Sequence, residues 1–310
     1  MRKTMLMTSN LKPPLLTGLI RPGLQLLTIL LVVVITAFAQ KPNEPQGKSR
    51  IATLDHVRIH YETYGEGRAA LVLIHGWSCN IDYWRNQIPE FAKRRRVIAI
   101  DLPGHGKSDK PEIAYTMDFF ARAVDAVLRD AGVERAVLVG HSMGTPVARQ
   151  FYRKYPEKTL AIVIVDGALR PFGDKAATDQ MLAAIRSPNY LEVGQQMFKA
   201  MGGPSLSEEN QSLIKASFTS TPQQVLVSAM EGMADPSIWG PDRIDVPVLA
   251  IMAGDSPYWP ADNEQFYRSI APKLDYQKMP GVGHFLMLQK PAEFNAAVIA
   301  FLDKNNLLRP

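Results

Sequence analysis

The sequence predicts an α/β fold in which a mostly parallel β-sheet is covered by helices on both faces and carries an all-helical insertion. Short apolar, β-branched runs alternate with amphipathic segments of helical length, as expected for strands buried in a parallel sheet. That alternation stops between residues 167 and 245, where helical segments follow one another without a strand. A chain of 310 residues is long enough for one large domain with such an insertion.

The first 39 residues differ from the rest and resemble a secretory signal peptide. Their only charges are four basic residues, and residues 24–39 are a nearly unbroken apolar run that ends in Ala37-Phe-Ala39, a small-x-small cleavage site. We expect cleavage after Ala39, which gives a secreted or periplasmic protein with Gln40 at its mature end and no stable membrane span. The alternative is that the segment is retained as a membrane anchor, although the run is short for a span.

This segment also carries most of the basic charge. Without its four positive charges the formal net charge falls from +5 to +1, so the mature chain has no electrostatic footprint for nucleic acid. Cys79 is the only cysteine, which excludes an intramolecular disulfide in an oxidising compartment. No spacing of His, Cys, Asp or Glu suggests a metal site.

The first part of the core is predicted over residues 51–166, after a polar linker at 40–50 that contains two prolines. It begins with the alternating segment 57–64, which is typical of an antiparallel strand with one exposed face. Apolar runs and amphipathic segments then give buried strands at 71–74, 97–100, 136–139 and 161–165, and helices at 82–93, 117–128 and 145–152.

The insertion, residues 167–245, is predicted to form a helical cap over the carboxyl edge of the sheet. Prolines and glycines divide it into helices at 175–186, 191–201, 207–217 and 223–233. The second part of the core, residues 246–310, returns to the alternating pattern, with strands at 248–252 and 276–279 and helices at 264–270 and 292–302.

The turn between the strand 136–139 and the helix 145–152 contains the motif Gly140-x-Ser142-x-Gly144. In a strand–turn–helix context this motif forces the serine into a strained conformation with its hydroxyl exposed, because side chains at the two glycine positions would collide across the turn. We therefore predict that Ser142 is a nucleophile. The backbone N–H of Met143, at the start of the following helix, is placed to stabilise an oxyanion.

The layout and four motifs resemble the capped α/β-hydrolase fold family, over essentially all of the mature chain. The motifs are His75-Gly76, Asp101-x-Pro-Gly-His-Gly-x-Ser-Asp109, Gly140-x-Ser-x-Gly144 and Gly283-His284. The resemblance implies an eight-stranded sheet. It also implies that Trp77, which follows His-Gly, supplies the second oxyanion N–H, and that His284 is the general base.

The acid that supports the histidine has two candidates, Asp166 and Asp255. Members of the family usually carry it three residues past a glycine on the loop after the penultimate strand, and counting from Gly254 that residue is Pro257, which cannot serve. Asp255 is near this position but immediately follows the strand. Asp166 ends the sixth strand, where relatives resembling haloalkane dehalogenases place their acid. We favour Asp166.

The resemblance implies a serine hydrolase that needs no cofactor and cleaves a small apolar carboxylic ester or lactone through a Ser-His-Asp triad and an acyl-enzyme. Epoxide hydrolases and dehalogenases of this family use a carboxylate nucleophile, which Ser142 is not. Two alternatives remain open. One is carbon–carbon bond hydrolysis or perhydrolysis on the same triad, and the other is a non-catalytic ligand-binding protein with this fold.

Overall fold

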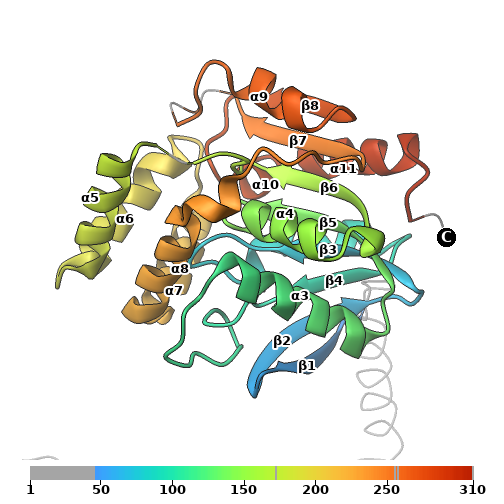
Figure 1. Cartoon of the computed structure of the whole chain (residues 1–310), viewed down its shortest axis with the longest axis horizontal. Helices are drawn as coiled ribbons and strands as arrows, with labels where there is room; N and C mark the ends of the chain where they lie inside the picture. The colour runs from blue at the N-terminus through green and yellow to red at the C-terminus, as the bar shows by residue number, and fades with distance from the viewer. Residues whose placement is uncertain (1–45, 172, 255, 257, 309–310) are drawn as a thin grey trace, which may run out of the picture. The chain divides into compact units, whose positions relative to one another are not determined.

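The computed structural model describes residues 46–308 apart from 172, 255 and 257, so the predicted signal peptide and the alternative anchor lie outside the described residues. An eight-stranded sheet runs through the molecule in the order β1-β2-β4-β3-β5-β6-β7-β8 (Figure 1). The strand β2 pairs in antiparallel fashion with β1 and with β4. All the other neighbouring strands in this sheet pair in parallel. The predicted fold class, a mostly parallel eight-stranded sheet, is confirmed.

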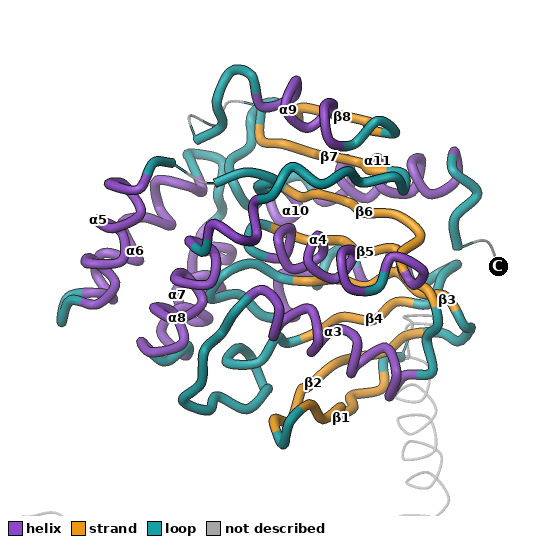
Figure 2. Tube along the Cα trace, in the orientation of Figure 1, coloured by secondary structure: helices purple, strands orange, loops and turns teal. Residues whose placement is uncertain are grey.

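The strands are β1 Lys48–Leu54, β2 Val57–Tyr64, β3 Ala69–Ile74, β4 Val97–Ile100, β5 Arg135–His141, β6 Thr159–Val165, β7 Val248–Ala253 and β8 Leu274–Met279. The central strands are buried on both faces because helices cover each side. Helices α3 Met117–Ala131 and α4 Gly144–Lys154 lie on one face, and α11 Pro291–Lys304 lies on the other (Figures 1 and 2). The remaining core helices are α9 Asn263–Ile270 and the short α10 Leu286–Gln289.

The predicted helix over residues 82–93 is wrong. The segment forms a 3-10 helix, Ile81–Trp84, and a separate single turn, α2 Ile88–Phe91. Pro89 has no N–H to donate to the carbonyl four residues earlier, so a continuous helix loses a hydrogen bond there. The Asn80 side chain starts the first piece by accepting the N–H of Asp82.

The strand β1 is not predicted from the sequence pattern. This edge strand pairs with β2 along its full length, and it begins inside the segment 40–50 that was predicted as a linker. Its first four residues are exposed, so the polar composition that suggested a linker also suits a strand at the edge of the sheet.

Between β6 and β7 the described residues contain helices and no strand. They are α5 Lys175–Arg186, α6 Tyr190–Gly202, α7 Glu208–Ser220, α8 Gln223–Ala234 and a 3-10 helix, Pro236–Trp239. This helical cap reaches the loops that follow the carboxyl ends of the strands. Trp77, after β3, donates its indole N–H to the carbonyl of Leu226, and His284, after β8, donates its backbone N–H to the carbonyl of Met201.

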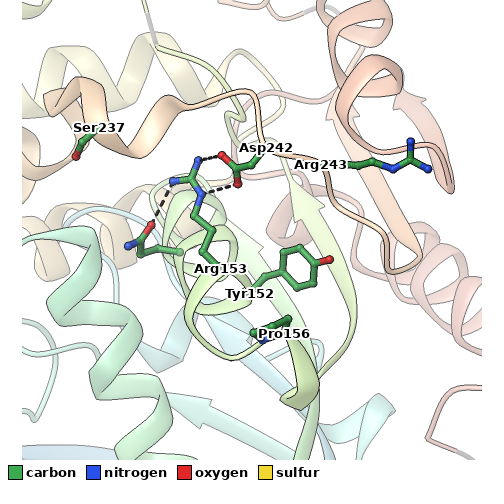
Figure 3. Close-up of a pocket in the computed structure, with 7 residues that line it drawn as sticks. Tyr152, Arg153, Pro156, Ser237, Asp242 and Arg243 are labelled. Atoms are coloured by element: carbon green, nitrogen blue, oxygen red, sulfur yellow. Dashed lines mark hydrogen bonds and ion pairs between the residues drawn. The ribbon is translucent and has the colours of Figure 1, made fainter.

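A buried arginine of α4 holds both ends of the cap. The guanidinium of Arg149, 1% exposed, donates to the carbonyl of Leu169, before α5, and to the carbonyl of Gly240, after α8. Burial lowers the pKa of Arg149 to about 10, so it keeps its charge at neutral pH. One turn further along α4, Arg153 makes a two-pronged ion pair with Asp242 (Figure 3).

None of the helices in the described part of the chain combines the length and the apolar character that a membrane span requires.

Candidate active site

The turn after β5 holds Ser142 in a left-handed backbone conformation, with φ of 51°. Its side chain is only partly buried, although the strand and helix on either side are in the core. The predicted reason for the two glycines is met. A Cβ at Gly140 would lie 2.3 Å from the carbonyl oxygen of Gly144, and a Cβ at Gly144 would lie 2.4 Å from the carbonyl oxygen of Ile74. The turn therefore closes tightly enough to push Ser142 outward.

Two backbone N–H groups next to this turn have no acceptor among the described residues. They belong to Trp77 and Met143, which are 5% and 1% exposed. The loops that carry them are in contact, since a Cβ at Gly76 would lie 3.0 Å from the Cβ of Ser142. Buried N–H groups are nearly always paired, so two unpaired ones beside one serine fit an oxyanion hole.

The structure brings His284 and Asp166 together. The imidazole Nδ1 donates a 2.7 Å hydrogen bond to Asp166 Oδ2, and the side chains of both residues are buried. Asp166 directly follows β6 and has φ of 42°, and its other oxygen, Oδ1, accepts the N–H of Ala253 at 2.8 Å and the indole N–H of Trp259 at 2.7 Å. Three donors thus hold both oxygens of Asp166 in place. The other candidate acid, Asp255, lies outside the described residues.

No hydrogen bond joins Ser142 Oγ to His284 within the described part of the chain. The two residues are nevertheless linked through His141, which precedes the serine. The His141 ring lies 4.8 Å from the His284 ring, centre to centre, and its Nε2 donates to the backbone carbonyl of His284 at 3.0 Å. Catalytic hydrogen bonds are often long in ligand-free enzymes and shorten when the substrate binds.

Two further histidines brace the loop that carries Trp77. His75 Nε2 accepts the N–H of Leu102 at 3.0 Å, and its Nδ1 donates to the carbonyl of Gly76 at 2.8 Å, which fixes one neutral tautomer. Burial lowers the pKa of His75, and it lowers the pKa of the neighbouring His105 to about 3. Both rings therefore support the loop without titrating near neutral pH.

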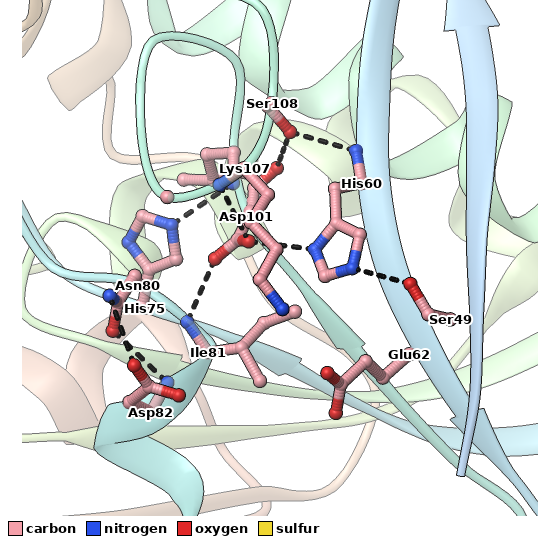
Figure 4. Close-up of polar contacts among 12 residues, drawn as sticks. Ser49, His60, Glu62, His75, Asn80, Ile81, Asp82, Asp101, Lys107 and Ser108 are labelled. Carbon is pink, nitrogen blue, oxygen red and sulfur yellow. Dashed lines mark hydrogen bonds and ion pairs between the residues drawn. The ribbon is translucent and has the colours of Figure 1, made fainter.

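The motif after β4 is organised around Asp101 (Figure 4). Its carboxylate accepts hydrogen bonds from His60 Nδ1 at 2.7 Å, the N–H of Ile81 at 2.9 Å and the N–H of Lys107 at 3.0 Å. Burial raises the pKa of Asp101, but these donors outweigh it and hold the pKa below its usual range. The carboxylate thus ties β2, β4 and the start of the Ile81–Trp84 helix together.

His60 also accepts a 2.9 Å hydrogen bond from the hydroxyl of Ser49, so the chain contains a second Ser-His-Asp series, Ser49-His60-Asp101 (Figure 4). Ser49 differs from Ser142 in its backbone. It lies within the edge strand β1, paired with β2, and not in a strained turn at a helix N-terminus. This difference favours Ser142 as the nucleophile.

Cys79, near the oxyanion loop, is not poised to react. The side chain is buried, and burial raises the pKa of its thiol to about 12, so the reactive thiolate is absent near neutral pH. This agrees with a thiol that packs in the core.

Two residues that contact the site could not be found from sequence. His141 holds the backbone of His284, and Trp259 holds Asp166. The first lies in the turn motif at a variable position, and the second lies in a loop with no motif of its own. Each contact joins positions more than 90 residues apart in the chain.

The chain matches known proteins along most of its length. The model of the α/β-hydrolase fold family matches residues 69–212. A solved N-acyl homoserine lactone degrading enzyme is 29% identical, with a TM-score of 0.70, over 81% of this chain and 100% of that one. A solved thermophilic esterase is 25% identical, with a TM-score of 0.69, over 84% and 99%. Among curated sequences, the dihydrolipoyllysine-residue acetyltransferase component of the acetoin cleaving system of Pseudomonas putida is 26% identical, and the match covers 79% of this chain but only 66% of that protein.

With a sheet of this topology and these matches, the chain has the α/β-hydrolase fold and resembles members of that family. The solved relatives named above are hydrolytic enzymes of this fold.

Proposed function

We propose that this protein is a serine hydrolase that cleaves a carboxylic ester or a lactone with Ser142, His284 and Asp166. One observation carries the proposal. The strained serine lies beside two unpaired backbone N–H groups, and its neighbour in the chain is bonded to the histidine that Asp166 holds. Nucleophile, oxyanion donors and base are the three parts that acyl transfer requires.

The reaction follows from this arrangement. His284 Nε2 takes the hydroxyl proton as Ser142 Oγ bonds to the substrate carbonyl carbon, and the carbonyl oxygen becomes an oxyanion held by the N–H groups of Trp77 and Met143. The C–O bond to the alcohol then breaks, and the alcohol oxygen takes the proton from His284. Water attacks the acyl-enzyme in the same way and releases the acid. In a lactone the alcohol and the acid are one molecule.

Two observations support an apolar ester or lactone. The solved relatives at 29% and 25% identity are described as a lactone-degrading enzyme and an esterase. In addition, Phe198 of α6 and Phe218 of α7 pack against Trp77 with ring centres 6.0 and 5.8 Å away, and Phe198 also packs against Phe285, next to His284. The cap thus packs aromatic side chains beside the proposed catalytic groups, and this apolar environment suits an apolar acyl group.

The test is a panel of p-nitrophenyl esters of graded chain length together with several lactones, assayed with purified protein. We expect turnover of at least one class, and labelling of Ser142 by a fluorophosphonate probe, located by peptide mass spectrometry. Labelling of Ser142 with no turnover of any ester or lactone would favour carbon–carbon bond hydrolysis or perhydrolysis on the same triad. Absence of both would favour a ligand-binding protein.

The value of kcat/KM is expected to fall as the pH is lowered, and the acid limb of its pH profile should have the slope of a single titrating group. The base must be neutral to accept the serine proton, and a free imidazole titrates near pH 6.5. Burial lowers the pKa of His75, His105 and His141, so any limb from these neighbours lies at lower pH than that of a free imidazole. The measurement is kcat/KM on an activated ester across this range, with circular dichroism to show that the fold persists. A flat profile would contradict a histidine base.

We also propose that the protein is exported and cleaved after Ala39. The support is the sequence of the first 39 residues, with its basic start, apolar run and small-x-small end. Intact-mass analysis of the exported protein should give a chain that begins at Gln40. A mass that includes the apolar run would establish the membrane-anchored alternative.

A further inference from the structure

We propose that Trp259 is a positioning residue for the reaction, because its indole N–H holds the carboxylate of Asp166 in the orientation that faces His284. This inference rests on the proposed function, which assigns Asp166 as the acid. Trp259 lies in the loop after β7, 93 residues along the chain from Asp166, and its Nε1 donates a 2.7 Å hydrogen bond to Asp166 Oδ1.

The two oxygens of Asp166 have different partners. Oδ1 accepts the N–H groups of Trp259 and Ala253, at 2.7 and 2.8 Å, and Oδ2 accepts only Nδ1 of His284, at 2.7 Å. The last torsion of an aspartate is soft, so its hydrogen bonds set the plane of the carboxylate. Two donors at Oδ1 fix that oxygen against the end of β7 and turn Oδ2 towards the imidazole.

The indole also affects how strongly the carboxylate attracts a proton on His284. Asp166 is 1% exposed, so its charge is balanced mainly by these hydrogen bonds and little by water. Each donor draws negative charge towards itself. Without the indole N–H, more of that charge faces the imidazolium, which then holds its proton to a higher pH.

Among the described residues, the other titratable groups around the pair come from three elements. They are His141 of β5, Tyr267 of α9 and Tyr276 of β8. Burial lowers the pKa of His141, and burial raises the pKa of both tyrosines, to which the charge of Asp166 adds. All three are neutral near pH 7. Arg170, whose charge acts on Tyr276, makes two hydrogen bonds to Asp262, so the charges of these two side chains offset each other. A change at Trp259 should therefore act through Asp166.

The first test is Trp259→Phe, which keeps an aromatic ring and removes the N–H. We expect kcat to fall about tenfold with KM changed less than about twofold, because the lost hydrogen bond orients a catalytic group and does not touch the substrate. The acid limb of the kcat/KM profile should move up by about half a pH unit or more. A purely structural role would lower activity without moving the limb.

The matched control is Trp239→Phe. The indole N–H of Trp239 donates to the carbonyl of Met233 at 2.9 Å, within the cap and away from Asp166. Its kcat and its pH profile should match the wild-type values. If Trp259→Phe also matches them, the inference is overturned.

A double-mutant cycle tests whether Trp259 acts through Asp166. In an Asp166→Asn background no carboxylate remains to accept the Nδ1 proton of His284, so adding Trp259→Phe should change kcat by less than about twofold. An undiminished tenfold loss there would overturn the inference.

A further measurement needs no turnover and so separates this inference from the proposed function. The ring protons of His284 are followed by NMR as the pH is changed, and the titration should move to higher pH in Trp259→Phe. An unchanged titration would overturn the role of Trp259 even if Ser142 proves to be the nucleophile. A shifted titration would support it even if the proposed reaction proves wrong.

Discussion

Replacing Ser142 with alanine is expected to lower kcat by about 10⁴- to 10⁶-fold on any ester or lactone that the wild-type protein cleaves. Alanine has no oxygen with which to form the acyl-enzyme, so only the oxyanion donors and substrate binding remain. The fold should persist, because serine and alanine meet the same backbone strain at φ of 51° and the side chain is only partly buried. Initial rates of the purified variant, with circular dichroism for the fold, measure this effect.

The control for this prediction is Ser49→Ala. Ser49 is hydrogen-bonded to His60, which is paired with Asp101, so it has the same sequence of partners as a catalytic serine. Its activity should stay within about twofold of the wild type, since a surface strand offers no strained turn to present the hydroxyl. If Ser142→Ala kept a tenth of the activity and Ser49→Ala lost it, the nucleophile would lie in the second series.

Asp166→Asn is the second change with a large expected effect, a fall in kcat of about 10⁴-fold with little loss of substrate binding. The amide oxygen can keep the hydrogen bonds of Ala253 and Trp259, which turns the NH2 group towards His284. That donor faces Nδ1 and favours the tautomer whose Nε2 carries the proton. A histidine in this state cannot accept the proton of Ser142. Single-turnover and steady-state kinetics on one activated ester report kcat and binding separately.

The comparison variant is Asp255→Asn, which changes the other candidate acid. Its kcat should remain close to the wild-type value if Asp166 alone supports His284. A collapse confined to Asp255→Asn would reverse the assignment. Modest losses in both variants would show that the two carboxylates share the role.

Much of the fold could be predicted because the residues of most strands have a local pattern that is typical of a buried strand. The runs that became β3 to β7 are apolar and β-branched, and a strand buried on both faces needs little else. The errors fall where local pattern is weak. The amphipathic segment 82–93 was divided by Pro89, and the polar strand β1 is held by its pairing with β2 and not by its composition.

The site residues also divide into those that a local motif predicts and those that depend on contacts between distant parts of the chain. Ser142 and Met143 could be predicted because one short motif fixes a turn, and a turn is local. The choice between Asp166 and Asp255 could not be made from spacing. It depends on which carboxylate reaches Nδ1 of His284 across the sheet, and the 2.7 Å contact of Asp166 is made over 118 positions of chain. The contacts of Trp259 and His141 also join distant positions of the chain, so spacing could not predict them either.

The hold of Arg149 on both ends of the cap has a consequence for how such proteins diversify. Leu169 and Gly240 are bonded to one guanidinium, so the chain leaves the core and returns to it at a single place. The chain between these residues can change in length without changing the pairing of β6 with β7, since a longer connection adds little to the entropic cost of loop closure. A library of grafts with its junctions at Leu169 and Gly240 would vary the cap, provided that each graft keeps two carbonyls in place, those that correspond to Leu226 and Met201. These two carbonyls accept the indole N–H of Trp77 and the backbone N–H of His284, so the cap contributes to the placement of the proposed catalytic groups.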